Sequence, residues 1–288
     1  MVLESLLNPI KAEKKPSLMI LFGFLAVSVS ILLGLWIFRD HVSLVMVFLT
    51  VIACVPIMYS TLRYEEIKDT EMNIKESTLL TEHSKALVAF MFLFLGFVLA
   101  FVAFYVFLPN NLVTEVFSIQ TNTISNINGN MIASSTGHVS SHVTIFTRIF
   151  FNNLKVLMFC LLFSFFYGAG AIFILTWNAS VIGAYIGSFI RANIAKYASS
   201  VGLFKVGAYF KVIFIGFTKL SFHGIPEIMA YFIGGLAGGI ISVAVIRHDF
   251  STKKFEKIIL DSADLILISI AILFIAAIIE VFVTPAIF

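Results

Sequence analysis

The chain has 288 residues, of which 60% are hydrophobic and 12% are charged, and its mean hydropathy is +1.03. Soluble domains are about half apolar and about one-quarter charged, so this composition excludes a soluble protein and leaves no length for a sizeable soluble domain. The formal net charge of +3 is too small to indicate a nucleic-acid partner. The composition therefore predicts one integral membrane domain whose main partner is the lipid bilayer.

The N-terminal region, residues 1–108, is predicted to cross the membrane three times. Apolar runs at residues 17–38, 42–59 and 86–108 are each long enough to cross about 30 Å of hydrocarbon as a helix. Between the second and third runs, residues 60–85 are rich in Glu and Lys, which indicates a solvated helix. We therefore expect three spans, with residues 60–85 forming a charged cytoplasmic segment.

Residues 109–147 differ from both neighbouring regions, because they are rich in Asn, Ser, Thr and Gly and contain almost no charge. Such a composition is typical of a loop that has no core of its own. We predict an exposed, mobile polar loop on the outer side of the membrane.

The C-terminal region, residues 148–288, is predicted to form the membrane core. Residues 198–220 are apolar but interrupted by three lysines, which indicates a helix lying in the membrane interface. The predicted fold class is an all-α polytopic membrane protein with about seven transmembrane helices and one interfacial helix. Four apolar runs of the C-terminal region fit spans: residues 151–177, 179–197, 221–246 and 262–283.

Small residues and asparagines mark specific positions in these spans. Asn152 opens the first of them and Asn178 closes it, so both are predicted to lie at helix ends. Glycines four residues apart allow two membrane helices to approach closely, and we expect such contacts in two spans. The predicted packing glycines are Gly183, Gly187, Gly234, Gly235, Gly238 and Gly239.

Polar side chains within the apolar runs are the best indication of a site. His223 and Glu227 are four residues apart and share one helix face, and Glu280 lies near the end of the last run. A carboxylate is costly in lipid, so both are expected to face protein or a water-filled pocket. With seven spans the last two helices are antiparallel, which brings these three residues and Asn153 to a similar depth. We predict that the four form a polar cluster.

The chemistry of this cluster stays open at the level of sequence. His223, Glu227 and Glu280 are candidate metal ligands, since a catalytic zinc normally has three protein ligands. The same residues could act as an acid–base pair, or His223 and Glu227 could cap a helix start through hydrogen bonds. No complete catalytic set is recognisable, so we assign no catalytic residue and no cofactor.

The charged segments predict the orientation. With a cytoplasmic N-terminus, most Lys and Arg lie in the inner segments 1–16, 60–85 and 247–261, as the positive-inside rule requires. An alternative in which residues 179–197 re-enter the membrane satisfies the rule equally well. We prefer seven spans, because residues 179–197 are long enough to cross and Arg191 can extend to the interface.

Four motifs of the C-terminal region stand out: Asn152-Asn153, Asn178 with Gly183, His223-Gly224-x-x-Glu227 before a Gly-rich helix, and Ala276-Ala277-x-x-Glu280 followed by Pro285. Together they resemble the stage II sporulation protein M family of integral membrane proteins. The resemblance covers residues 145–288, and the first three spans show no matching feature. It implies a multi-pass protein of the cell membrane that acts in envelope remodelling, alongside peptidoglycan-degrading partners in spore-forming bacteria.

Two functions from different classes follow. The first is a non-catalytic scaffold or recruiting component of an envelope- or membrane-remodelling complex, with other membrane or envelope proteins, or further copies of the chain, as partners. The alternative is an intramembrane metal-dependent hydrolase, or a transporter of small solutes or ions, that uses His223, Glu227 and Glu280.

Overall fold

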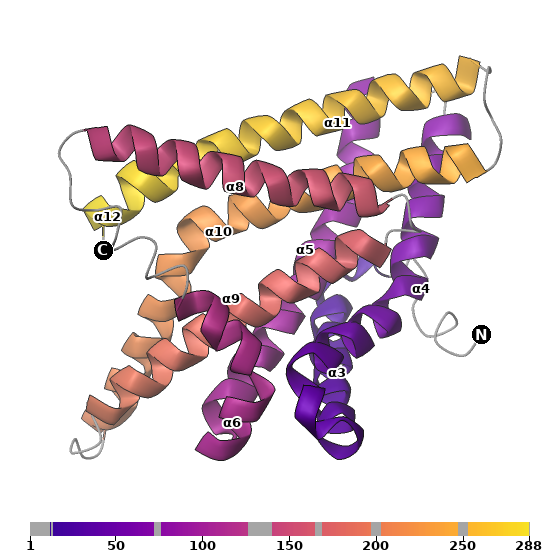
Figure 1. Cartoon of the computed structure of the whole chain (residues 1–288). Helices are drawn as coiled ribbons and strands as arrows, with labels where there is room; N and C mark the ends of the chain where they lie inside the picture. The colour runs from indigo at the N-terminus through magenta and orange to yellow at the C-terminus, as the bar shows by residue number, and fades with distance from the viewer. Residues whose placement is uncertain are drawn as a thin grey trace.

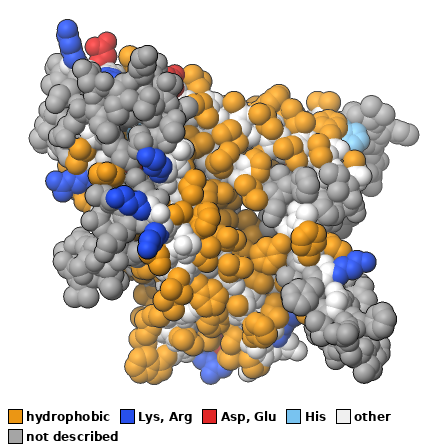
Figure 2. Space-filling model, turned by 180° about the vertical axis from the view of Figure 1, so that it is seen from behind, with side chains coloured by type: hydrophobic (Ala, Val, Ile, Leu, Met, Phe, Trp, Pro, Cys, Tyr) orange, Lys and Arg blue, Asp and Glu red, His pale blue; other side chains and the backbone are white. Residues whose placement is uncertain are grey.

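A computed structural model describes residue 12 and residues 14–71, 76–125, 140–164, 169–196, 203–246 and 253–287 (Figure 1). Every element of the described part is helical, and seven helices are long and apolar enough to cross a membrane. The protein is therefore an all-α polytopic membrane protein, which confirms the predicted fold class. Figure 2 shows the broad hydrophobic face that such a protein presents to lipid, with Lys and Arg side chains near its edges.

Three helices form the N-terminal part: α3 (Ser17–Ile37), α4 (Val42–Glu71) and α5 (Glu76–Phe107). α3 packs against both α4 and α5. The contact with α5 is close, because a Cβ placed on Gly23 would lie 2.6 Å from the carbonyl oxygen of Leu93. Close backbone approach of this kind stabilises membrane helices through van der Waals contact.

The charged segment at residues 60–85 is not simply solvated. α4 continues to Glu71 and α5 begins at Glu76, and within these extensions Glu65 and His83 are buried. The prediction of a solvated helix is wrong for these two residues. The reason is local amphipathicity, because the buried Leu62 and Ala86 lie one turn from them and bring the same helix faces into the bundle.

The predicted polar loop is also partly helical. α6 (Asn110–Val116) and a helical segment at residues 118–125 follow α5, while residues 126–139 lie outside the described part. Val113, Val116 and Phe117 are buried in the core, so the prediction of an exposed, mobile loop is wrong here. These residues have the i, i+3, i+4 spacing of a helix that packs on one face.

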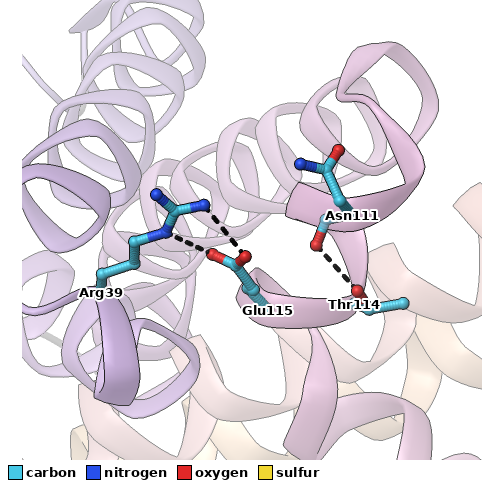
Figure 3. Close-up of polar contacts among 4 residues, drawn as sticks. All are labelled: Arg39, Asn111, Thr114 and Glu115. Atoms are coloured by element: carbon cyan, nitrogen blue, oxygen red, sulfur yellow. Dashed lines mark hydrogen bonds and ion pairs between the residues drawn. The ribbon is translucent and has the colours of Figure 1, made fainter.

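Polar contacts hold this segment against the bundle. Arg39, in the 3₁₀ turn η1 (Arg39–His41), donates from Nε and Nη2 to the Glu115 carboxylate at 2.7 and 3.0 Å (Figure 3). The buried amide of Gln120 accepts a hydrogen bond from the Ser43 hydroxyl at 2.7 Å and donates one to the Ser180 hydroxyl at 3.2 Å. The segment after α5 is thereby joined to both α4 and the following core.

The boundary between the next two helices, α8 (Ser140–Ser164) and α9 (Ala169–Lys196), differs from the predicted one. The two helices are separated at residues 165–168, outside the described part, and not at Asn178. Asn152 lies exposed inside α8, and Asn178 lies inside α9, where its Nδ2 donates to the Ile174 carbonyl at 3.0 Å. The prediction of helix ends at these residues is wrong, because α8 continues through Asn152, and Asn178 bonds its own helix one turn back without ending it.

α10 (Leu203–Ile246) is one continuous helix that passes through Pro226. The sequence predicts a separate interfacial helix followed by a span, and the structure instead joins the two. Figure 1 shows α10 bending between a first part beside α9 and a second part between α8 and α11 (Lys253–Ile278). Pro226 explains a bend, since it lacks the N–H for a helical hydrogen bond and its ring crowds the carbonyl one turn back.

The second part of α10 is the centre of the bundle, because 83% of the most apolar stretch within Gly224–Ile246 is buried. A Cβ on Gly238 would lie 2.8 Å from the Leu161 carbonyl oxygen of α8, and one on Gly239 would lie 2.6 Å from Leu62 of α4. The predicted packing glycines all lie against another helix: Gly183 against Phe101, Gly187 against Tyr105, Gly234 against Leu157, Gly235 against Ala171, Gly238 against Leu161 and Gly239 against Leu62.

Candidate functional site

The candidate site begins with one hydrogen bond between two helices. Asn153 of α8 donates from Nδ2 to the Glu227 carboxylate of α10. Asn153 is buried and Glu227 is half-buried. Both side chains lie in segments long and apolar enough to cross the membrane, where an amide donor compensates part of the cost of removing a carboxylate from water.

Glu280 approaches the same place from a third helix. It lies in a π-helical segment, η2 (Ile279–Val283), which follows α11, precedes α12 (Thr284–Ile287), and packs against both α8 and α10. The charges of Glu280 and Glu227 interact electrostatically. Pro285 accounts for the wider helical turn, because its ring would crowd the carbonyl four residues earlier in a regular α-helix. The Thr284 hydroxyl donates to the Ile279 carbonyl at 3.1 Å and supports this turn.

Tyr231 belongs to the same group of side chains and was not predicted. It is only 3% exposed, and it lies near enough to Glu227 and Glu280 for a charge on either carboxylate to act on its hydroxyl group. It follows Glu227 by four residues, so the two share a helix face. That spacing is a signal in the sequence that could have identified it.

The predicted residues are only partly brought together by what the structure describes. Asn153 is hydrogen-bonded to Glu227, and Glu280 is near enough to act on Glu227 electrostatically, whereas the His223 side chain lies outside the described residues. Among the described side chains, no group of three or more His, Cys, Asp or Glu is arranged to hold a metal ion. A metal site that includes His223 therefore stays an untested prediction.

The arrangement has two chemical capacities. A polar network can connect α8, α10 and η2, since each contributes one of the three side chains. Two nearby carboxylates in apolar surroundings can also share a proton or bind a cation, because like charges oppose simultaneous ionisation. Asn153 contributes a hydrogen-bond donor to either arrangement.

A second buried polar contact lies elsewhere in the bundle. Nδ1 of His83 on α5 is 2.6 Å from Oε2 of Glu65 on α4, and the two side chains are 3% and 0% exposed. Sequence reasoning missed this pair because both residues lie in the charged segment at residues 60–85. The buried Leu62 and Ala86 on the same helix faces were the available signal.

Comparison with known proteins gives one match. Residues 88–285 match the family model described as Stage II sporulation protein M. No curated protein and no solved structure shows significant similarity to the chain. The match begins within α5, so it extends further than the predicted resemblance, and it contains Asn153, Glu227 and Glu280. Because it covers more than half of the sequence, the chain belongs to the stage II sporulation protein M family.

Proposed function

We propose that the protein is a non-catalytic membrane scaffold, or a recruiting component, of a complex that remodels the cell envelope or membrane. The observation that carries this proposal is the hydrogen bond between Asn153 and Glu227, which connects α8 to α10 within the family-matched region, with Glu280 of η2 acting on Glu227 electrostatically. A scaffold needs a rigid arrangement of helices, and a polar network inside a membrane supplies one.

The packing around α10 supports the same proposal. Glycines along its second part leave no room for a side chain between α10 and its neighbours, so the helices meet closely. The exposed surface of the spans is apolar and suits contacts with lipid or with the membrane helices of other proteins (Figure 2). A bundle of this kind can present fixed surfaces to partners without carrying out chemistry.

A second candidate is an intramembrane hydrolase or a transporter of small solutes or ions. It is favoured by one observation, the proximity of the half-buried carboxylates Glu227 and Glu280. Carboxylates inside membrane spans often mark the path of an ion or a proton. His223 completes the candidate set for this function.

Crosslinking in native membranes, followed by purification and mass spectrometry, tests the scaffold. We expect the same few membrane or envelope proteins to be recovered with the unaltered chain and with Glu227→Gln, provided that the variant is folded. Metal content and solute flux of purified, reconstituted protein provide the opposing test. If the protein binds stoichiometric metal or carries a solute flux, and folded Glu227→Gln loses it, the second candidate is favoured over the scaffold.

We also propose that the N-terminus lies in the cytoplasm. Thr114→Cys, on α6, should react with a membrane-impermeant thiol reagent added to intact cells, whereas Lys253→Cys, at the start of α11, should not. The native Cys54 and Cys160 are buried and provide a low background. Labelling of Lys253→Cys in intact cells would show that the orientation is the reverse of the proposed one, or that one of the seven helices does not cross the membrane.

A further inference from the structure

We propose that a recess on the hydrophobic face, between α5, α9 and α10, binds one hydrocarbon chain of a membrane phospholipid. The recess has a volume of about 250 Å³. Figure 2 shows the hydrophobic face hollowed near its centre. Its walls include Leu95 and Val98 of α5, Ile182 and Ile186 of α9, and Ile225 and Ile228 of α10.

The position of the recess determines what can reach it. These wall residues lie inside the candidate spans His83–Phe107, Ala171–Ile194 and Gly224–Ile246. Ile225 and Leu95 are 52% and 39% exposed, so the recess opens sideways from the bundle. At this depth the medium outside a membrane protein is lipid hydrocarbon and not water.

The chemistry of the wall selects the same occupant. The side chains that line the recess are all apolar, with Phe217 and the aromatic residues of α5 among them. An apolar cavity of about 150 Å³ in a protein interior stays free of water and can bind small apolar molecules. An empty recess would also forfeit the dispersion contacts of its lining atoms.

The size of the recess argues against a partner helix as the occupant. A helix with its side chains is about 10–12 Å across, too wide to enter a space of this volume. A flexible acyl chain is narrow enough and is present at high concentration in the bilayer. Ile225 and Ile228 flank Glu227 along α10, so a bound chain would pack against the helical turn that carries this carboxylate.

Photolabelling of the reconstituted full chain tests this proposal. The probe is a phosphatidylcholine with a diazirine in one acyl chain, diluted into vesicles of phosphatidylethanolamine and phosphatidylglycerol. We expect several-fold more label on the recess peptides of α5, α9 and α10 than on Phe159 and Leu162, which are exposed inside the α8 span. Equal labelling of the recess and the exposed α8 residues would overturn the proposal.

Variants with a larger side chain in the wall of the recess provide a second test, with a matched control elsewhere on the surface. Ile225→Phe and Leu95→Phe change partly exposed wall residues, and each should lower the label on the remaining wall several-fold. Leu267→Phe, at a position of α11 that is 64% exposed, is the control and should leave the label unchanged. If folded Ile225→Phe and folded Leu95→Phe both keep the full label on the remaining wall of the recess, the proposal is also overturned. If the variants do not fold, the labelling pattern of the unaltered chain alone decides.

Discussion

Two polar contacts inside the bundle differ in burial and in their place relative to the family match. Asn153 and Glu227 join α8 to α10 within residues 88–285, and Glu227 is half-buried. Glu65 and His83 join α4 to α5 before the match begins, and both are almost fully buried. The first contact thus belongs to the region common to the family, whereas the second attaches α4 to the start of that region.

This difference shows that one physical requirement is met in two ways. A carboxylate in the membrane region needs a donor or an opposite charge, whatever its role. Asn153 provides a neutral donor to a carboxylate that has a second carboxylate nearby, whereas His83 provides a direct partner to a carboxylate with no exposed surface. We therefore expect loss of the second contact to harm folding more than loss of the first.

Glu65→Ala should have the largest effect, a loss of about 3 kcal/mol in the free energy of unfolding. The change removes the carboxylate that lies 2.6 Å from Nδ1 of the buried His83, and breaking a buried pair of this kind is strongly destabilising. Denaturation in mixed detergent micelles measures the change, and Glu256→Ala on exposed α11 surface is the control. If the two variants are equally stable, Glu65 and His83 do not attach α4 to α5.

Gly238→Ala tests the close packing that surrounds the first contact. The new Cβ would meet the Leu161 carbonyl oxygen at 2.8 Å and Ser164 Cβ at 2.9 Å, so α8 and α10 must separate. We expect a loss of about 2 kcal/mol, as for other overpacked positions. Gly207→Ala has nothing within 4 Å and should be neutral or stabilising, because Ala favours helix over Gly. Equal melting temperatures for the two variants would contradict the close contact.

Asn153→Ala should cost about 1–2 kcal/mol, because it removes the amide that donates to Glu227 in a half-buried position. Asn152→Ala, the adjacent and exposed residue on α8, is a matched control and should change stability little. The same denaturation assay compares the two variants. A larger loss for Asn152→Ala would show that the hydrogen bond does not stabilise the bundle.

The smallest effect is expected for Arg39→Ala. The hydrogen bond and charge of Arg39 lower the pKa of Glu115, so the folded protein keeps this carboxylate ionised to a lower pH than the unfolded chain does. The contribution is present at neutral pH and is lost as the pH falls through the lowered pKa. It should also disappear in high salt, because the pair is exposed. A melting-temperature difference that persists at low pH and in high salt would contradict this account.

Hydropathy and length were sufficient to predict the all-helical fold and the spans, because crossing a bilayer requires long apolar helices. They were insufficient to locate turns within apolar sequence. In the apolar run at residues 151–177, Gly168 and Gly170 follow the end of α8 at Ser164, but glycine is also common inside membrane helices and does not by itself mark an end. Asn178 resembles a cap although it bonds inside α9. Pro226 is compatible with a helix start and with a bend, and only the tertiary arrangement selects the bend.

The candidate site was partly predictable for a related reason. Glu227 and Glu280 are conspicuous because they interrupt apolar runs, and seven spans predict a similar depth for the two. Glu65 and His83 are inconspicuous because their neighbours along the chain are also charged, although burial depends on helix face and not on local composition. Tyr231 was missed because an aromatic residue in an apolar helix does not stand out.

A double-mutant cycle on Glu227→Gln and Glu280→Gln tests most directly whether the polar cluster acts as one network. The measured quantity is the free energy of unfolding of the two single variants and the double variant. The cycle on Glu256→Gln and Glu280→Gln is the control, since these residues lie about 36 Å apart along one helical segment. We predict a coupling energy above about 0.5 kcal/mol for the first pair and additivity for the control. Additive effects of Glu227→Gln and Glu280→Gln would contradict a shared network that connects α10 to η2.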